Sequence, residues 1–401
     1  MPVLNKKNSR RNFVKISAFF ASLLIFGKLA WHFFYNKKKM NSNNNIDRNK
    51  IMDTINKPLI MNRTAYVYDP YFLKHTQEGH PEFSGRLVAI MEKLEDSGIL
   101  KTLIKIPAKK CTIDQLLLVH PQSHIDNVKY VSESKIPYLD TDTYTNEFSY
   151  NAALLAAGSL IELTNAVVQQ KVKNGFAIIR PPGHHAVKKQ SMGFCIFSNV
   201  AIAAKVAQNQ FNIKKIAIID FDVHHGNGTQ DIVNEDPDIL FISTHQYPLY
   251  PGTGRIEETG KGEGKGSTMN IAVPAGTGDE GFGKIYDQII IPSLHKFQPE
   301  LILVSAGYDA HWSDPLAGLT LSLEGFAEIS KKLINVAEEL CKGKIVFSLE
   351  GGYNLDALSN GVMNSIKLLS RRDDIYDPIG KSNNVEPDIT ELIKEIIKIH
   401  G

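Results

Sequence analysis

Six short runs of apolar residues recur along this chain of 401 residues, and long helical patterns such as 148–170 and 322–341 separate them. The runs lack the polar alternation of half-exposed strands, which is typical of strands buried on both faces of a sheet. The pattern therefore predicts an α/β fold with a mostly parallel central sheet flanked by helices. The predicted strands are 65–68, 176–179, 216–221, 239–243, 301–305 and 345–349.

The composition is that of an ordinary globular protein, with 43% hydrophobic and 22% charged residues and a formal net charge of +2. Basic residues are spread along the chain, so no nucleic-acid binding is expected. Cys111, Cys195 and Cys341 are widely spaced and form no CxxC pair. A disulfide framework and a thiolate metal site are both disfavoured, so any metal must be held by Asp, Glu or His.

The first 50 residues differ from the rest of the chain. Basic residues precede an uncharged run at 16–27, and apolar residues continue to 35 with Lys28 as an interruption. The 20 residues from 16 to 35 are just enough to span a bilayer, which predicts an uncleaved membrane anchor. A cleaved export signal and an amphipathic targeting tail are the alternatives. We expect membrane attachment or export, with a cytoplasmic location as the alternative.

Three segments are expected along the chain. The N-terminal anchor or signal and a flexible polar linker occupy 1–50, and the main α/β domain spans 62–375. A helical tail packed on that domain occupies 376–401. The pattern does not predict an oligomeric state.

Polar side chains gather directly after five of the predicted strands. Ligands in open α/β sheets bind beyond the carboxyl ends of the strands, so these side chains are expected to share one site. Asp222 and His224 are two positions apart, and in an extended backbone their side chains point to the same side. Asp309 follows another strand and offers a third ligand. Three protein ligands with an open position are typical of a catalytic zinc site.

Asp220 is two positions before Asp222, so its side chain is expected on the same side of the extended backbone. Two neighbouring carboxylates repel unless one of them pairs elsewhere. The tandem histidines His184 and His185 follow the strand 176–179 and are the candidate partners. His225 is interpreted as a packing or supporting residue rather than a metal ligand.

Five motifs resemble the zinc-dependent histone deacetylases, in particular the class II enzymes and the bacterial histone-deacetylase-like amidohydrolases. They are RPPGHHA (180–186), DFDVHHGNGTQ (220–230), YPGTG (250–254), AGYDAH (306–311) and LEGGYN (349–354). The resemblance covers the chain from about residue 64 to about residue 370. It implies the single-domain α/β fold that this family shares with arginase. Arginases have a D-x-H-x-D motif at this strand, and this chain has Gly226 at the fifth position of the motif. The missing carboxylate favours one metal ion over two.

Carried over by position, the resemblance implies a role for each site residue. One zinc ion per chain is held by Asp222, His224 and Asp309. The catalytic group consists of His184, His185, Asp220 behind His184, Asn227 behind His185, and Tyr353. The substrate tunnel is walled by Phe194 and Tyr250, with Gly193 near the substrate amide. A structural potassium ion is held by main-chain oxygens of Asp220, Asp222, His224 and Thr244, together with Ser243.

The implied reaction removes an acetyl or longer acyl group from a lysine peptide or a small acylated amine. His185 is expected to act as the general base, and Tyr353 as a donor to the developing oxyanion. Leu316, at the expected tunnel rim, offers no charge to a distant ammonium, which favours acyl-lysine over acetylpolyamines. The alternatives are an acetylpolyamine amidohydrolase, a catalytically inactive acyl-lysine-binding protein and a binuclear ureohydrolase.

Overall fold

The computed structural model describes residues 63–400. Its centre is an eight-stranded sheet in the order β2-β1-β3-β8-β7-β4-β5-β6, and each pair of neighbouring strands is parallel. The predicted α/β fold is thereby confirmed. The strands are β1 (Thr64–Val67), β2 (Ile104–Lys105), β3 (Asn174–Ala177), β4 (Ile216–Asp220), β5 (Ile239–Gln246), β6 (Thr268–Val273), β7 (Leu301–Ala306) and β8 (Ile345–Leu349).

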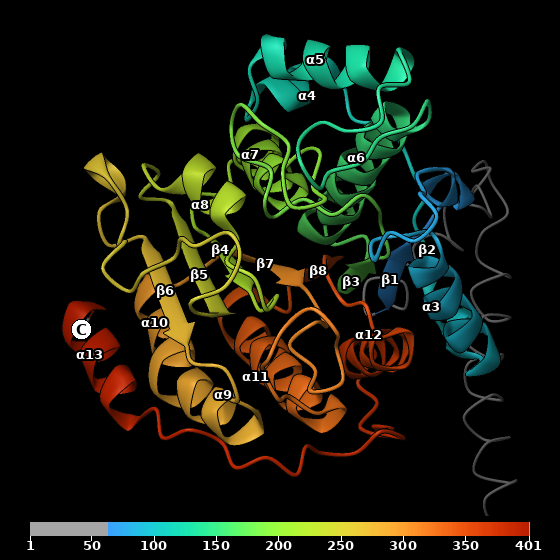
Figure 1. Cartoon of the computed structure of the whole chain (residues 1–401). Helices are drawn as coiled ribbons and strands as arrows, with labels where there is room; N and C mark the ends of the chain where they lie inside the picture. The colour runs from blue at the N-terminus through green and yellow to red at the C-terminus, as the bar shows by residue number, and fades with distance from the viewer. Residues whose placement is uncertain (1–62, 401) are drawn as a thin grey trace, which may run out of the picture. The chain divides into compact units, whose positions relative to one another are not determined.

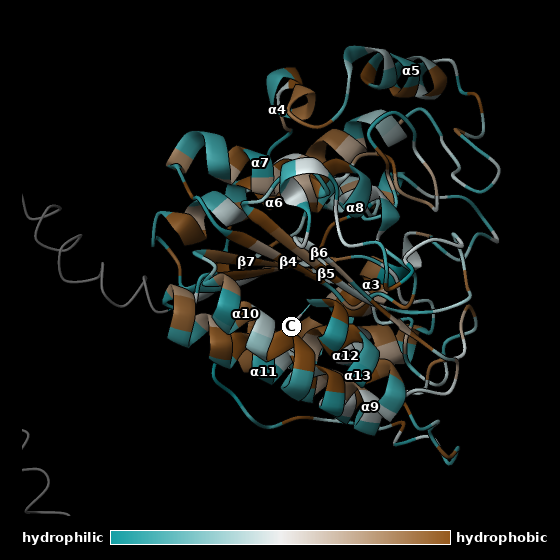
Figure 2. Ribbon diagram, turned by 90° about the vertical axis from the view of Figure 1, so that its left-hand side faces the viewer, coloured by the Kyte–Doolittle hydropathy of each residue, from teal (hydrophilic) through white to brown (hydrophobic). Residues whose placement is uncertain are grey.

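Helices cover both faces of the sheet (Figures 1 and 2). One layer contains α4 (Ile113–Leu117), α5 (Gln122–Glu133), α6 (Ser149–Val168), α7 (Asn199–Phe211) and α8 (Asn227–Val233). The other contains α3 (Gly85–Asp96), α9 (Asp279–Ile285), α10 (Ile291–Phe297), α11 (Leu323–Cys341), α12 (Leu355–Leu369) and α13 (Thr390–His400). The short helices are η1 (Pro70–Lys74), η2 (Ile99–Thr102), η3 (Gly262–Gly264) and the π-helical η4 (Tyr286–Ile290).

The helix α6 is long and apolar enough to cross a membrane, and among the described residues it alone meets that criterion. Most of its side chains are buried inside the domain, as expected for a core helix of an α/β protein. The predicted N-terminal anchor at 16–35 lies outside the described residues. The tail after residue 375 contains α13, whose Ile393 and Ile396 are buried.

Candidate active site

Four neighbouring strands, β3, β8, β7 and β4, deliver the predicted site residues. Each strand is fully buried and mostly apolar, and the predicted site residues lie at or after its carboxyl end. Because the strands are parallel, their carboxyl ends meet at one edge of the sheet. That edge brings together His184 and His185 after β3, Tyr353 after β8, Asp309 after β7, and Asp222 and His224 after β4.

Asp222, His224 and Asp309 form a compact cluster in which one ligand atom from each residue lies within 4.8 Å of the others. His224 Nδ1 lies 3.2 Å from Asp222 Oδ1 and 3.4 Å from Asp309 Oδ2. Both carboxylates are buried, and Asp309 Oδ2 accepts no hydrogen bond from the described residues. Buried carboxylates with an unsatisfied oxygen are costly unless a cation neutralises them. The donor set therefore fits a divalent ion such as zinc.

Backbone amides hold the other oxygens of this cluster. The Val223 N–H donates to Asp309 Oδ1 over 3.0 Å, and the Gly351 N–H donates to Asp222 Oδ2 over 2.8 Å. A Cβ atom at position 351 would lie 2.1 Å from Asp309 Oδ2, so the close approach of this backbone requires glycine. The loop after β8 thus forms one wall of the cluster.

The tandem histidines have different partners. His184 Nδ1 lies 3.1 Å from Asp220 Oδ2, and His185 Nδ1 lies 2.7 Å from Asn227 Oδ1. Burial alone would lower the pKa of His184, but Asp222 and Asp220 raise it to about 10. Burial lowers the pKa of His185, and the neighbouring His184 lowers it further. His184 is therefore suited to a cationic role, and His185 to accepting a proton on Nε2.

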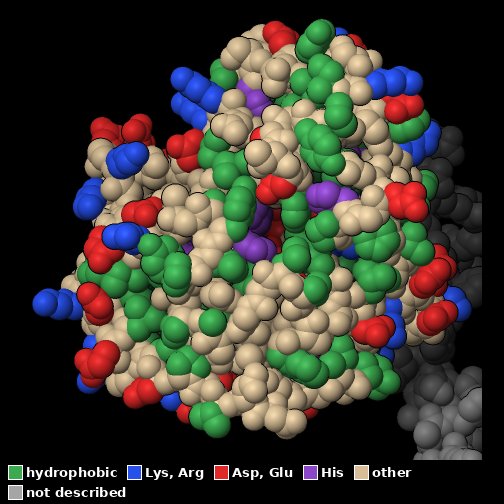
Figure 3. Space-filling model, in the orientation of Figure 1, with side chains coloured by type: hydrophobic (Ala, Val, Ile, Leu, Met, Phe, Trp, Pro, Cys, Tyr) green, Lys and Arg blue, Asp and Glu red, His purple; other side chains and the backbone are tan. Residues whose placement is uncertain are grey.

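Aromatic side chains border the approach to these histidines. The ring centroid of Phe194 lies 6.0 Å from that of Tyr353, and the ring centroid of Tyr250 lies 5.1 Å from that of His185. Gly193 has a φ of +56°, and a Cβ atom there would lie 2.5 Å from His185 Cδ2, so this position also requires glycine. Histidine side chains set below the surface, with hydrophobic side chains around them, are visible near the middle of Figure 3.

The hydroxyl of Tyr353 is protonated at neutral pH. Burial raises the pKa of this group well above its ordinary value of 10, and the positive charge of Arg86 only partly opposes that shift. A neutral phenol can donate a hydrogen bond to an oxygen that gains negative charge.

Leu316 and the predicted potassium residues are also placed by the structure. Leu316 is half-buried, and its backbone N–H donates a hydrogen bond to Asp314 Oδ1. Asp220 and Ser243 are register partners on β4 and β5, and the buried Thr244 Oγ1 has no hydrogen-bond partner in this range.

Glu350 belongs to this site although the sequence analysis assigned it no role. Its Oε2 accepts hydrogen bonds from the N–H groups of Gly183 and His184, over 2.7 and 3.2 Å. It therefore holds the backbone that carries the tandem histidines. Its position in the sequence could have indicated this role, because Glu350 directly follows a buried strand at the same edge as the other acidic residues.

A buried ion network supports the loop after β8. Glu82 lies between Arg86 and Arg180, and all three side chains are 0% exposed. Arg180 Nη2 donates to Glu82 Oε2 over 2.7 Å, and Arg86 Nε donates to the Gly352 carbonyl over 2.7 Å. Burial alone would raise the pKa of Glu82, but Arg180 and Arg86 together lower it to about 2. The ionised carboxylate therefore stabilises the fold above its ordinary pKa of 4.5, and this contribution is lost as the pH falls towards 2.

Replacing Glu82 with Gln is expected to destabilise the protein by about 3–5 kcal/mol at pH 7, because two buried guanidinium groups lose their counter-charge. Urea unfolding measures this difference. Glu162→Gln is the control, because Glu162 pairs with the exposed Lys109 and its loss should cost less than about 1 kcal/mol. Equal effects of the two substitutions would contradict the assignment.

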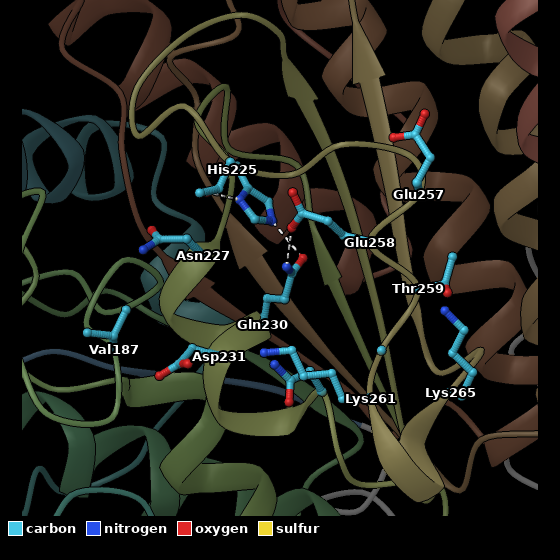
Figure 4. Close-up of a pocket in the computed structure, with 13 residues that line it drawn as sticks. Val187, His225, Asn227, Gln230, Asp231, Glu257, Glu258, Thr259, Lys261 and Lys265 are labelled. Carbon is cyan, nitrogen blue, oxygen red and sulfur yellow. Dashed lines mark hydrogen bonds between the residues drawn. The ribbon is translucent and has the colours of Figure 1, made fainter.

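His225 supports the site from outside the metal cluster. Its ring nitrogens lie 2.8 Å from Thr253 Oγ1 and 2.9 Å from Gln230 Oε1, as Figure 4 shows for Gln230. His225 also lines a cavity of about 450 Å³ over α8 and the loop 253–265, where most of the lining residues are polar. The cavity shares Asn227 with the predicted catalytic residues but none of the three metal-cluster residues.

Comparisons with known proteins agree with this geometry. A family model described as "Histone deacetylase domain" matches residues 80–369. "Histone deacetylase 14, chloroplastic" from Arabidopsis thaliana is 42% identical over 320 residues, which cover 76% of each chain. A "Probable deacetylase" from Archaeoglobus fulgidus is 42% identical over 296 residues, covering 73% of this chain and 82% of that protein. The crystal structure of the HDA15 HD domain superposes with a TM-score of 0.78 at 35% identity, covering 85% of this chain and 94% of the other.

Proposed function

Since the chain belongs to the histone deacetylase family, we propose that it is a zinc-dependent amidohydrolase that removes acetyl groups from lysine side chains or related amines. The observation that carries this proposal is the buried cluster of Asp222, His224 and Asp309 beside His185 and Tyr353. An acyl-binding protein without catalysis would have no need for a protonated tyrosine and a neutral histidine beside such a cluster.

The proposed metal ligands are His224 Nδ1 and one carboxylate oxygen each from Asp222 and Asp309. When bound, zinc polarises an amide carbonyl and lowers the pKa of a water molecule to about 7. One ion is proposed per chain, because a Cβ atom at position 226 would lie 2.1 Å from Asp220 Oδ2. An additional carboxylate at that position, which a binuclear site would use, has no room.

His185 and His184 divide the proton chemistry in this proposal. His185 donates a hydrogen bond from Nδ1–H to Asn227 Oδ1, which leaves Nε2 free to take a proton from the attacking water. The same Nε2 then gives that proton to the leaving amine nitrogen, so that the products are a carboxylic acid and a free amine. His184 is held by Asp220 and supplies a positive charge beside the reaction.

Tyr353 donates its hydroxyl proton in a hydrogen bond to the amide oxygen as negative charge develops there. Phe194 and Tyr250 exclude water from the aliphatic stem of the substrate, and the lower local dielectric strengthens the electrostatic interactions. Structural potassium is proposed at the main-chain oxygens of Asp220, Asp222, His224 and Thr244, together with Ser243, the register partner of Asp220.

One observation favours acetylpolyamines as alternative substrates. Burial raises the pKa of Tyr250, and the carboxylates of Asp142 and Asp140 raise it further, so negative charge lies near one wall of the approach. A carboxylate at this position could attract an ammonium group of a substrate. Acyl-lysine remains the primary proposal, because Leu316 adds no charge on the loop after β7.

The Leu316→Glu substitution is expected to shift the ratio of kcat/KM towards acetylpolyamines by about 1–3 kcal/mol, since the new carboxylate would meet a substrate ammonium in a partly desolvated pair. Leu316→Gln is the matched control for size without charge. Competition between an acetyl-lysine peptide and an acetylpolyamine measures the ratio. A wild type that already prefers acetylpolyamines would show that Leu316 does not set the preference.

The proposed function is tested by measuring turnover of acetyl-lysine peptides, longer acyl-lysines and acetylpolyamines, each with and without a chelator. We expect hydrolysis of acyl-lysine that is lost with the chelator and restored by zinc. Hydrolysis that survives complete removal of metal would contradict the zinc assignment, and failure on the whole panel would contradict the amidohydrolase.

A further inference from the structure

Asp314 connects two loops of the active site. It lies on the segment between β7 and α11 and is 6% exposed. Its Oδ2 accepts hydrogen bonds from the N–H groups of Tyr353 and Asn354, over 2.7 and 3.0 Å. Its Oδ1 accepts the N–H of Leu316 over 3.1 Å. One carboxylate therefore joins the loop after β7 to the loop after β8.

The backbone on both sides of Tyr353 is also fixed. Before it, Gly351 N–H donates to Asp222, and the Gly352 carbonyl accepts from Arg86. After it, Asn354 caps α12 by accepting the N–H groups of Asp356 and Ala357. At Tyr353 itself, the backbone N–H donates its hydrogen bond to Asp314 Oδ2. The backbone of Tyr353 is thus fixed by a carboxylate five residues after Asp309.

We propose that Asp314 is a positioning residue that sets the Tyr353 hydroxyl for its hydrogen bond to the substrate oxygen. The proposal rests on the proposed amidohydrolase function and adds to it a residue that touches neither metal nor substrate. Both carboxylate oxygens of Asp314 accept hydrogen bonds from N–H groups, so an amide side chain cannot replace the carboxylate. An Asn at this position would turn an NH₂ group towards at least one of these donors, and the loop after β8 would shift.

The test compares Asp314→Asn with the wild type, in the full chain loaded with zinc. We expect kcat to fall by about 10- to 100-fold, because a shift of about 1 Å in a catalytic group has an effect of this size. KM and zinc content should change little. The same substitution in a Tyr353→Phe background should change kcat by less than about threefold, because the hydroxyl that it positions is already absent.

Glu386→Gln is the matched control. Glu386 also accepts three backbone N–H groups, from Gly278, Glu280 and Gly281, but it lies away from the predicted catalytic residues. The Glu386→Gln substitution should leave kcat unchanged. If Asp314→Asn lowers kcat equally with and without the Tyr353 hydroxyl, raises only KM, or loses zinc, Asp314 acts through another group and the proposal is wrong.

Three further outcomes are decisive. If turnover of Tyr353→Phe is too slow to measure, the kcat, KM and zinc content of Asp314→Asn decide alone: a fall in kcat with the other two unchanged supports the proposal, and any other combination overturns it. A wild type without amide hydrolysis removes the proposed function and this inference together. An active wild type with an equally active Asp314→Asn variant removes the inference alone.

Discussion

Asp309→Asn is expected to lose bound zinc and to lower kcat/KM by about 10³-fold or more, because a catalytic metal supplies several kcal/mol of stabilisation to the transition state. Asn keeps the volume of the side chain and one oxygen, but it removes the charge. The remaining charge of Asp222 and the imidazole of His224 would bind a divalent ion far more weakly. Metal analysis after gel filtration, together with kinetics, measures both effects.

The fold should survive this substitution. Burial raises the pKa of Asp309 and the charge of Asp222 raises it further, so the ionised Asp309 is unfavourable without a metal ion, and the metal-free variant should be at least as stable as the metal-free wild type. Asp373→Asn is the control, because Asp373 is exposed and pairs with Lys331 on the surface. Full zinc occupancy in Asp309→Asn would show that Asp309 is not a ligand.

Tyr353→Phe is expected to lower kcat by about 10²–10³-fold, the usual effect of removing one donor to an oxyanion. The ring would keep its contacts with Phe194 and with the Arg86 guanidinium, so stability and zinc content should remain close to those of the wild type. Tyr376→Phe, at an exposed tyrosine, is the control. An unchanged kcat would mean that the oxyanion is stabilised by other groups.

The strands that were predicted correctly from the sequence are those whose apolar runs lie in the middle of the sheet. β4, β7 and β8 begin at the first residue of the predicted run. β3 ends earlier than predicted, because Ile178 and Ile179 are buried in the connection towards the histidines rather than paired as strand. β2 and β6 were missed. They are the two edges of the sheet, where strands are short or carry polar residues such as Thr268 and Asn270.

The candidate site was predicted where the side chain itself carries the chemistry. Asp222 and His224 could be paired by their spacing, and the structure places them in one cluster with Asp309. Glu350 and Asp314 could not be assigned in this way, because they act on backbone N–H groups of other loops. Such contacts join segments that are far apart in the sequence and leave no spacing pattern. They become visible only when the ends of the strands are placed beside one another.

The central claim is that one metal ion, held by Asp222, His224 and Asp309, supports amide hydrolysis by this chain. Its most direct test is a titration of the metal-free protein with zinc, in which bound metal and hydrolysis of an acetyl-lysine peptide are followed together. The account predicts that activity rises linearly with added zinc and reaches its plateau at one equivalent per chain. A plateau at two equivalents, or activity that is already complete before zinc is added, would contradict it.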